Sequence, residues 1–170
     1  VPSVAAEFRR LGQDGNREVE TEKKVASLAN VRKTVVSRDD QMKDLEKAIA
    51  AKKVISLVLS PTNSGMGICL SSEDLFFIPF AKENVLLGDE NQGVTSAALG
   101  EFLKSVFASK ENLVVTDDGK GLLKFLASLK VTPVEAEIHD EIVAFWLLNS
   151  HRDNYSLSFI AEEIGHYFGD

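Results

Sequence analysis

Apolar and polar positions along this chain follow two periods, one typical of strands and one typical of helices. After residue 53, three short runs rich in β-branched and aromatic residues follow one another, and brief polar turns separate them. Short turns between consecutive strands indicate an antiparallel meander, in which each strand pairs with the next one. The three predicted strands are Val54–Leu59, Met66–Ser71 and Asp74–Phe80.

Helical spacing of apolar residues appears after the meander and alternates with short apolar runs. Small hydroxyl or carboxylate residues stand at the expected helix starts, where their oxygens can accept backbone N–H groups. In order, we predict a helix capped by Thr95 and ending near Phe107, a strand over 112–116, a helix over 120–130 capped by Asp117 or Asp118, and a strand over 131–138.

Residues 138–168 read as two helices joined by a polar turn. Asp140 is placed to cap the first helix and Ser156 the second, and the turn-rich residues 149–154 separate them. Apolar residues recur on one face of the second helix up to Phe168. We therefore expect a helical hairpin at this end of the sequence.

Residues 1–50 differ from the rest, because they are charge-rich and show only a ragged apolar pattern. We interpret them as a charged arm or linker with one helix at about 38–51, capped by Ser37 or Asp39. The remaining residues, 51–170, then form one α/β domain. A meander followed by αβα crossovers gives a mixed sheet flanked by helices.

Composition excludes some classes of function. The 170 residues carry a formal net charge of −7, which argues against a broad basic surface for nucleic acid. There is no apolar run of membrane-spanning length and no signal-peptide pattern, so we expect a cytoplasmic protein that does not enter membranes, and a monomer. The single cysteine, Cys69, lies in an apolar run and is interpreted as a buried, inert thiol.

The predicted helical hairpin carries the most specific signal. His139-Asp-Glu-Ile-Val-Ala-Phe-Trp-Leu-Leu-Asn-Ser resembles the "FDTxLAxYLLxP" helix of the 3′–5′ exonuclease domain of bacterial DNA polymerase I, and the segment from Tyr155 resembles its "xSLxxLAxxYLG". Ala6-Glu-Phe-Arg-Arg-Leu is similar to the "EFRSLLKRL" piece that precedes that domain. The resemblance implies a ribonuclease H-like fold over residues 51–170.

The resemblance also implies where catalytic carboxylates should be. Such exonucleases hold two divalent metals with an Asp-x-Glu on the first strand and further Asp residues in "NxKxD" and "YxxxD" helices. Here the strand positions fall at Val58 and Ser60, and Leu122 stands at the aspartate of the second motif. The third motif would lie beyond Asp170. The expected site therefore has no catalytic residue, no metal ligand and no cofactor.

Other candidate sites have simpler readings. Asp117, Asp118 and the acidic cluster Glu137, Asp140 and Glu141 suit helix starts, where the helix dipole favours negative charge. The histidines at 139, 151 and 166 are scattered, and Ser60 and Ser64 have no visible His–Asp partner. The glycine pairs at 65 and 67 and at 119 and 121 lack a phosphate-loop context. Trp146 lies on an apolar helix face and is expected in the core.

Three functions remain open. The first is a fragment of DNA polymerase I: a degenerate proofreading-like domain that is inactive itself, braces the polymerase domain of the same chain, and meets DNA only through that parent enzyme of replication and repair. The second is an active metal-dependent 3′–5′ exonuclease with unusual ligands drawn from Glu73, Asp74, Asp117, Asp118 or Asp140. The third is an unrelated α/β interaction domain that uses the charged arm.

Overall fold

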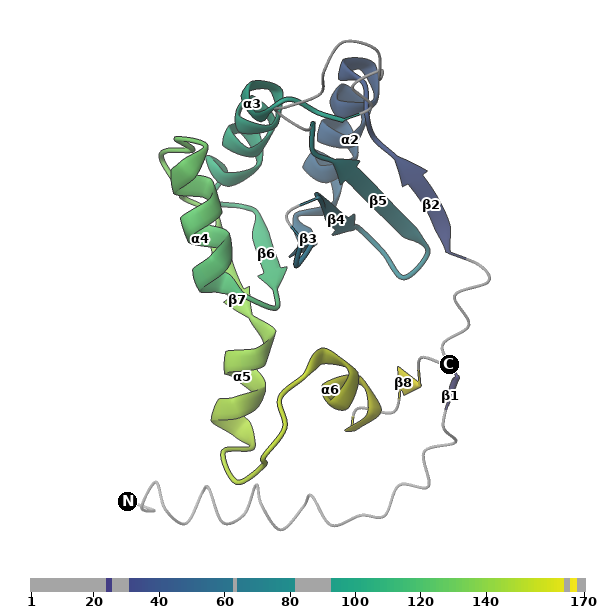
Figure 1. Cartoon of the computed structure of the whole chain (residues 1–170), viewed down its shortest axis with the longest axis vertical. Coiled ribbons are helices and arrows are strands. Elements are labelled where there is room, and N and C mark those ends of the chain that lie inside the picture. Colours follow the sequence, from purple (N-terminus) through teal and green to yellow (C-terminus); the bar gives the residue numbers. More distant parts are fainter. Residues whose placement is uncertain (1–23, 26–30, 63, 82–92, 164–165, 168–170) are drawn as a thin grey trace.

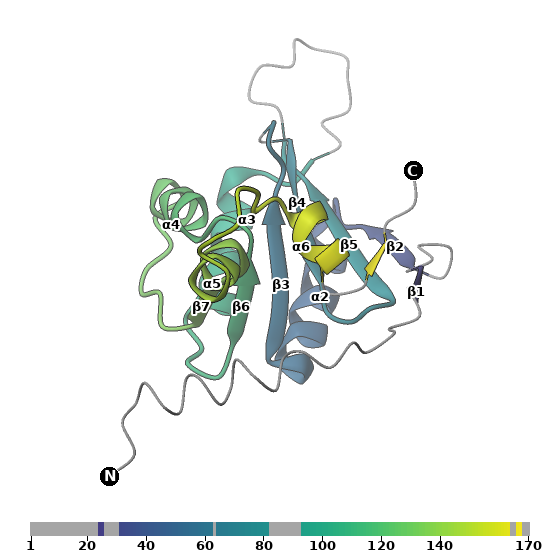
Figure 2. The ribbon, with the colours of Figure 1, turned by 90° about the horizontal axis from the view of Figure 1, so that it is seen from below.

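A six-stranded mixed sheet forms the centre of the computed structural model, which describes residues 24–25, 31–62, 64–81, 93–163 and 166–167. The strands are β2 (Arg32–Val35), β3 (Val54–Leu59), β4 (Gly65–Cys69), β5 (Asp74–Pro79), β6 (Leu113–Thr116) and β7 (Glu137–Asp140). Their order across the sheet is β2-β5-β4-β3-β6-β7, which Figure 2 shows from right to left. β4 runs antiparallel to both of its neighbours, and the other neighbouring pairs are parallel.

The helices are α2 (Asp39–Lys52), α3 (Ser96–Phe107), α4 (Gly119–Ser128), α5 (Glu141–Leu148) and α6 (Leu157–Glu163). In Figure 1, α2 and α3 lie above the sheet, whereas α5 and α6 lie below it. A short parallel pair, β1 (Lys24–Val25) and β8 (His166–Tyr167), joins the two ends of the described chain. No helix among the described residues is both long and apolar enough to cross a membrane.

The core lies between the sheet and the helices α2, α3 and α4. Side chains alternate across a strand, so residues 55 and 57 of β3 share one face with residues 66 and 68 of β4. These side chains are buried together with apolar residues of α2 and α3; the largest fully buried ones are Phe107, Leu45, Ile55, Leu57, Met66, Ile68, Ile78, Leu103, Leu122 and Leu126. The expected α/β fold with a mixed sheet flanked by helices is confirmed.

Local capping follows the sequence in most helices. Thr95 accepts the N–H of Ala98 at 3.3 Å, and Ser156 accepts the N–H of Phe159 at 3.3 Å, as predicted. α2 is different, because Arg38 takes the N-cap position and the side chain of Gln41 accepts its backbone N–H at 3.2 Å. The expected cap by Ser37 or Asp39 is therefore wrong.

The charged segment expected to be an arm contributes a strand to the sheet. β2 pairs in parallel with β5, and Val36 beside it is only 1% exposed. Arg32 and Lys33 are exposed, as charged side chains on edge strands commonly are, and this obscured the apolar pattern. Residues 1–23 and 26–30 lie outside the described residues.

Two predicted element boundaries near the end of the sequence differ from those in the structure. The last strand of the large sheet begins at Glu137 rather than at residue 131, because Val131 and Ala136 are buried in the connection that precedes it. The second helix of the hairpin ends at Glu163, and His166–Tyr167 pairs as a strand with β1 instead of continuing the helix.

Candidate functional site

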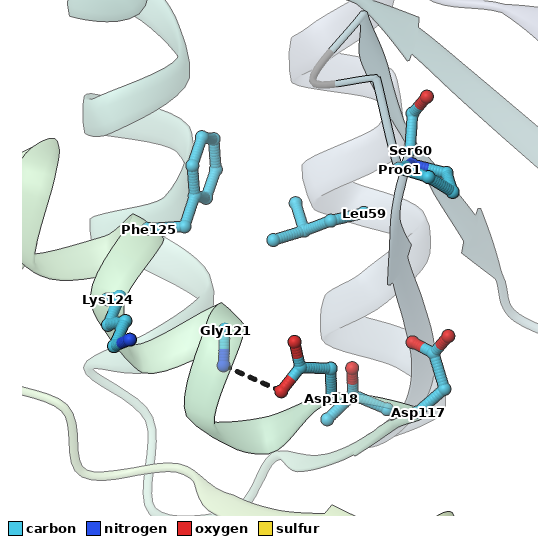
Figure 3. A pocket seen from close by; sticks show the side chains of 9 residues that line it. Leu59, Ser60, Pro61, Asp117, Asp118, Gly121, Lys124 and Phe125 are labelled. Carbon is cyan, nitrogen blue, oxygen red and sulfur yellow. Dashed lines mark hydrogen bonds between the residues drawn. The ribbon is translucent and has the colours of Figure 1, made fainter.

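A cleft of about 500 Å³ lies between the end of β3 and the start of α4. Figure 3 shows its walls: Leu59 and Phe125 face one another, and Asp117 and Asp118 lie at one end. Ser60, Pro61, Thr116, Gly121 and Lys124 complete the lining. β3 and β6 are parallel neighbours, so their carboxyl ends open on the same edge of the sheet. In open α/β sheets this edge is the usual position of a ligand site.

The three positions at which carboxylates were expected do not converge on this cleft. Ser60 lines it, and its hydroxyl lies 3.0 Å from those of Thr62 and Ser64. Val58 pairs with Gly67, so its side chain points to the sheet face opposite Leu57 and Leu59. Leu122 is fully buried in the core. Of the three positions, the structure brings only Ser60 to the cleft.

Two apolar walls of the cleft were not singled out from the sequence. Leu59 is the last residue of β3 and packs against the core, and Phe125 stacks on Phe80 with ring centroids 5.4 Å apart. The sequence does indicate that both side chains point inward. Leu59 follows Leu57 on the same face of the strand, and Phe125 lies one helical turn beyond Leu122. Leu59 and Phe125 line this part of the cleft with hydrocarbon, where a hard cation would find no oxygen ligand.

The carboxylates of Asp118 and Asp140 act as helix caps. Asp118 accepts the N–H of Gly121 at 2.8 Å, so it is Asp118 that caps α4. Asp140 accepts the N–H of Gly119 at 2.8 Å with one oxygen and that of Val143 at 2.9 Å with the other. Asp140 therefore satisfies the first turns of two helices at once, and the predicted capping roles are confirmed.

The glycines at the start of α4 serve this capping arrangement. A Cβ atom at Gly121 would collide with the carboxylate of Asp118, and one at Gly119 would lie 3.2 Å from an oxygen of Asp140. Removing the side chains allows both carboxylates to approach the helix start. The glycine pair therefore leaves room for the two capping carboxylates. These glycines do not form a phosphate-binding loop.

Negative charge accumulates beside these caps. The pKa of Glu141 is raised, first because the surrounding protein desolvates its carboxylate and then because Asp117 and Asp140 lie nearby. Asp117 lines the cleft and is partly buried. Even so, no group of three or more His, Cys, Asp or Glu side chains in the described part of the chain is arranged to hold a metal ion.

The other acidic candidates lie elsewhere. Asp74 stands at the beginning of β5 and accepts the Nε–H of Arg32 at 2.8 Å. That hydrogen bond is the main reason why the pKa of Asp74 is lowered. Glu73 is exposed in the preceding turn. Neither residue is brought to the cleft that Asp117 and Asp118 line.

The remaining singled-out residues fall into separate environments. His139 pairs with Glu137 at 2.8 Å, His151 is exposed, and His166 lies in β8, so they share no site. Burial raises the pKa of the Cys69 thiol, which is partly exposed. Trp146 is 49% exposed on α5, so its expected place in the core is wrong. The helix that carries it has too many apolar residues for one buried face.

Comparisons with known proteins identify the fold. No protein-family model matches the sequence, and no curated protein matches it. The catalytic core of RRP6 from Trypanosoma brucei aligns with a TM-score of 0.61 and 17% identity over 96% of this chain and 44% of that one. RNase D from Trypanosoma brucei aligns with a TM-score of 0.58 and 13% identity over 78% of this chain and 46% of that one.

The EXO domain of Nibbler from Aedes aegypti aligns with a TM-score of 0.50 and 15% identity, over 76% of this chain and 66% of that domain. These similarities show that the chain has an exonuclease-like fold. It spans less than half the length of the two Trypanosoma structures.

Proposed function

We propose that this chain is a degenerate 3′–5′ exonuclease-like domain that serves as a structural module of a longer DNA polymerase of the polymerase I type. The observation that carries the proposal is the composition of the cleft at the ends of β3 and β6. Leu59 and Phe125 wall it, and Asp118 and Asp140 nearby are committed to backbone N–H groups. Two-metal nuclease chemistry needs several free carboxylate oxygens that converge, whereas positions 58, 60 and 122 carry no carboxylate and do not converge.

The polymerase context rests on the resemblance of the α5–α6 hairpin to the polymerase I exonuclease domain. The net charge of −7 supports a domain that meets DNA through its parent enzyme. In this proposal, nucleotide transfer belongs to the polymerase domain of the parent chain, and the present domain supports that neighbour mechanically. Cytoplasmic location and a monomeric state belong to the same proposal.

One observation favours a second function, an active metal-dependent nuclease. Asp117, Asp118, Asp140 and Glu141 all lie around the starts of α4 and α5, and the first two line the cleft. A metal ion could compete with the backbone for the caps. This alternative requires Asp117 and Asp118 to be ligands, which makes it directly testable.

The test is a degradation assay with single-stranded DNA and single-stranded RNA of the same sequence, each labelled at the 5′ end, with Mg²⁺ or Mn²⁺. RNA is included because RNase D is among the proteins of similar fold. We expect no shortened products from the purified chain. Metal-dependent shortening that disappears in the double variant Asp117→Asn, Asp118→Asn would overturn the proposal in favour of the active nuclease.

The control variant is Asp153→Asn, which removes one exposed carboxylate from the turn between α5 and α6. Shortening that persists in the double variant at an unchanged rate would come from a contaminating nuclease. Loss of activity in the double variant but not in the control would assign the chemistry to the cleft.

A further inference from the structure

Seven of the eight residues of helix α5 are apolar, yet none of its residues is buried. Leu147 is 67% exposed and Leu148 is 83% exposed, and Val143 and Trp146 are about half exposed. A helix on the surface of a globular domain normally keeps a polar face toward water. A contiguous apolar surface of this kind marks a place where another molecule binds.

A groove of about 600 Å³ lies between α4 and the first turn of α5. Leu123 and Ala127 of α4 form one wall, Val143 of α5 the other, and Ile138 of β7 the floor. Leu123 is 49% exposed and Val143 is 50% exposed, so both walls present hydrocarbon. Leu123 and Ala127 lie one helical turn apart on α4, so side chains of a docked helix can fit against them.

Charge along the groove is asymmetric. Lys120 and Lys124 lie one turn apart on the α4 side, and neither takes part in an ion pair within the described residues. Two lysines at this spacing complement carboxylates at i and i+4 on a helix that lies in the groove. The partner's apolar face would cover α5, and its acidic edge would face α4.

Nucleic acid fits this groove less well than an acidic helix does. Asp140 lines the groove, and Glu141 stands beside it at the start of α5. The desolvated carboxylate of Glu141 already responds to the negative charge of its neighbours. A nucleic-acid strand carries phosphates along its whole length and would place some of them at this negative end, whereas a helix can keep its carboxylates beside the lysines of α4. The chain as a whole also carries a net charge of −7.

We propose that the groove between α4 and α5 binds an acidic amphipathic helix of a partner protein domain. Apolar side chains of that helix insert between Leu123 and Val143, and its carboxylates pair with Lys120 and Lys124. This groove would be the surface through which the proposed structural module contacts a neighbouring domain. Only that assignment of the partner rests on the proposed function.

The chain contains a built-in reporter, because Trp146 is its only tryptophan and lies half exposed on α5. The probe is a capped amphipathic peptide of about 15 residues with leucines on one face and glutamates along the flanks. A matched peptide carries lysine at every glutamate position. We expect the acidic peptide to shift the Trp146 emission to the blue in a saturable way, and the basic peptide to bind more weakly.

The variant Lys120→Glu, Lys124→Glu should weaken binding of the acidic peptide about three- to tenfold, because two exposed ion pairs are lost, and should strengthen binding of the basic one. The control Lys33→Glu, Lys43→Glu makes the same change of charge at exposed positions of β2 and α2 and should leave both affinities unchanged. All four lysines are exposed, so the variants are expected to fold.

Several results would overturn the inference. These are equal affinity for the two peptides, no saturable change in Trp146 emission, or an emission change caused only by duplex DNA. An emission change that follows protein concentration alone would point instead to a second copy of the chain on α5. The readout is independent of nuclease activity, so a chain that degraded nucleic acid and still bound the acidic peptide would refute only the proposed function.

Discussion

Asp140 connects two helices through a single carboxylate. Its two oxygens accept the N–H groups of Gly119 in α4 and Val143 in α5, at 2.8 and 2.9 Å. Asp118 accepts only one such group, from Gly121. At the scale of the residue, Asp118 and Asp140 therefore stabilise helix starts.

We expect Asp140→Ala to lower the free energy of unfolding by about 2 kcal/mol, and Asp118→Ala by about 1 kcal/mol, because they remove two caps and one cap respectively. Urea unfolding followed by circular dichroism measures both values. Asp153→Ala, in an exposed turn, serves as the control. Equal losses for Asp140→Ala and Asp118→Ala would show that the double cap contributes no more than a single one.

Restoring acidic residues at two motif positions should not restore chemistry. In the double variant Val58→Asp, Ser60→Glu, the new aspartate points to the sheet face opposite Leu59, and Leu122 remains in the core. We expect no metal-dependent degradation of the labelled DNA or RNA described above. Measurable degradation would mean that the proposed correspondence of positions 58 and 60, or the account of the cleft, is wrong.

The ion pair between Arg32 and Asp74 gives a prediction for pH dependence. The hydrogen bond from Arg32 lowers the pKa of Asp74 below its ordinary 3.8, so the folded state favours the ionised carboxylate. The resulting stabilisation is present above the unfolded-state pKa and is lost as pH falls through the lower, folded-state value. Asp74→Asn should therefore be less stable than the parent chain above pH 3.8, and the difference should shrink below it.

Urea unfolding of both proteins between neutral and strongly acidic pH checks this. Asp153→Asn, in the exposed turn between α5 and α6, controls for removing an acidic charge. A stability difference that stays constant across the whole range would contradict the role of the ionised carboxylate.

At the scale of the element, the sequence predicted the strands and helices whose side chains pack on the core with a clear period. β3, α3 and α4 begin and end within about two residues of the predicted bounds. Thr95 and Asp118 cap the two helices, and apolar residues recur along all three elements with the period of a helix or a strand. β2 was missed because an edge strand buries few of its side chains. The end of α6 was missed because pairing between β1 and β8 is a long-range contact that local periodicity does not reveal.

The helical hairpin of α5 and α6 is held together by aromatic contacts. Phe145 makes edge-to-face contacts with Tyr155 and Phe159, with centroid distances of 6.2 and 6.4 Å. The hydroxyl of Tyr155 donates to the carbonyl of Asn149 at 3.0 Å, and Arg152 pairs with Glu163 at 2.9 Å. These contacts tie α6 and the turn before it to α5.

We expect Phe145→Ala to reduce amide hydrogen-exchange protection in α6 by about 1–2 kcal/mol, because two aromatic pairs are lost, while α3 stays protected. Hydrogen exchange followed by mass spectrometry measures both helices in one experiment. Leu148→Ala is the matched control, because Leu148 is on the same helix and 83% exposed. Equal loss of protection in α3 and α6 would contradict the separate hairpin.

At the scale of the whole molecule, the fold follows from the order of its elements, and the site does not. A meander followed by crossovers predicts a mixed sheet, and the resemblance of the hairpin predicts its ribonuclease H-like form. The sequence also predicted that Asp140 is a cap and that Asp117 or Asp118 caps α4. It did not predict that Leu59 and Phe125 face each other across the cleft, since these walls belong to a strand and a helix whose residues lie more than sixty positions apart.

The most direct test of the central claim is isothermal titration of Mn²⁺ into the purified chain at neutral pH. A cleft walled by Leu59 and Phe125, with Asp118 and Asp140 bonded to backbone N–H groups, should give no saturable binding. Saturable, stoichiometric binding that is lost in Asp117→Asn, Asp118→Asn and retained in Asp153→Asn would contradict the account, because it would show that the cleft is a metal site.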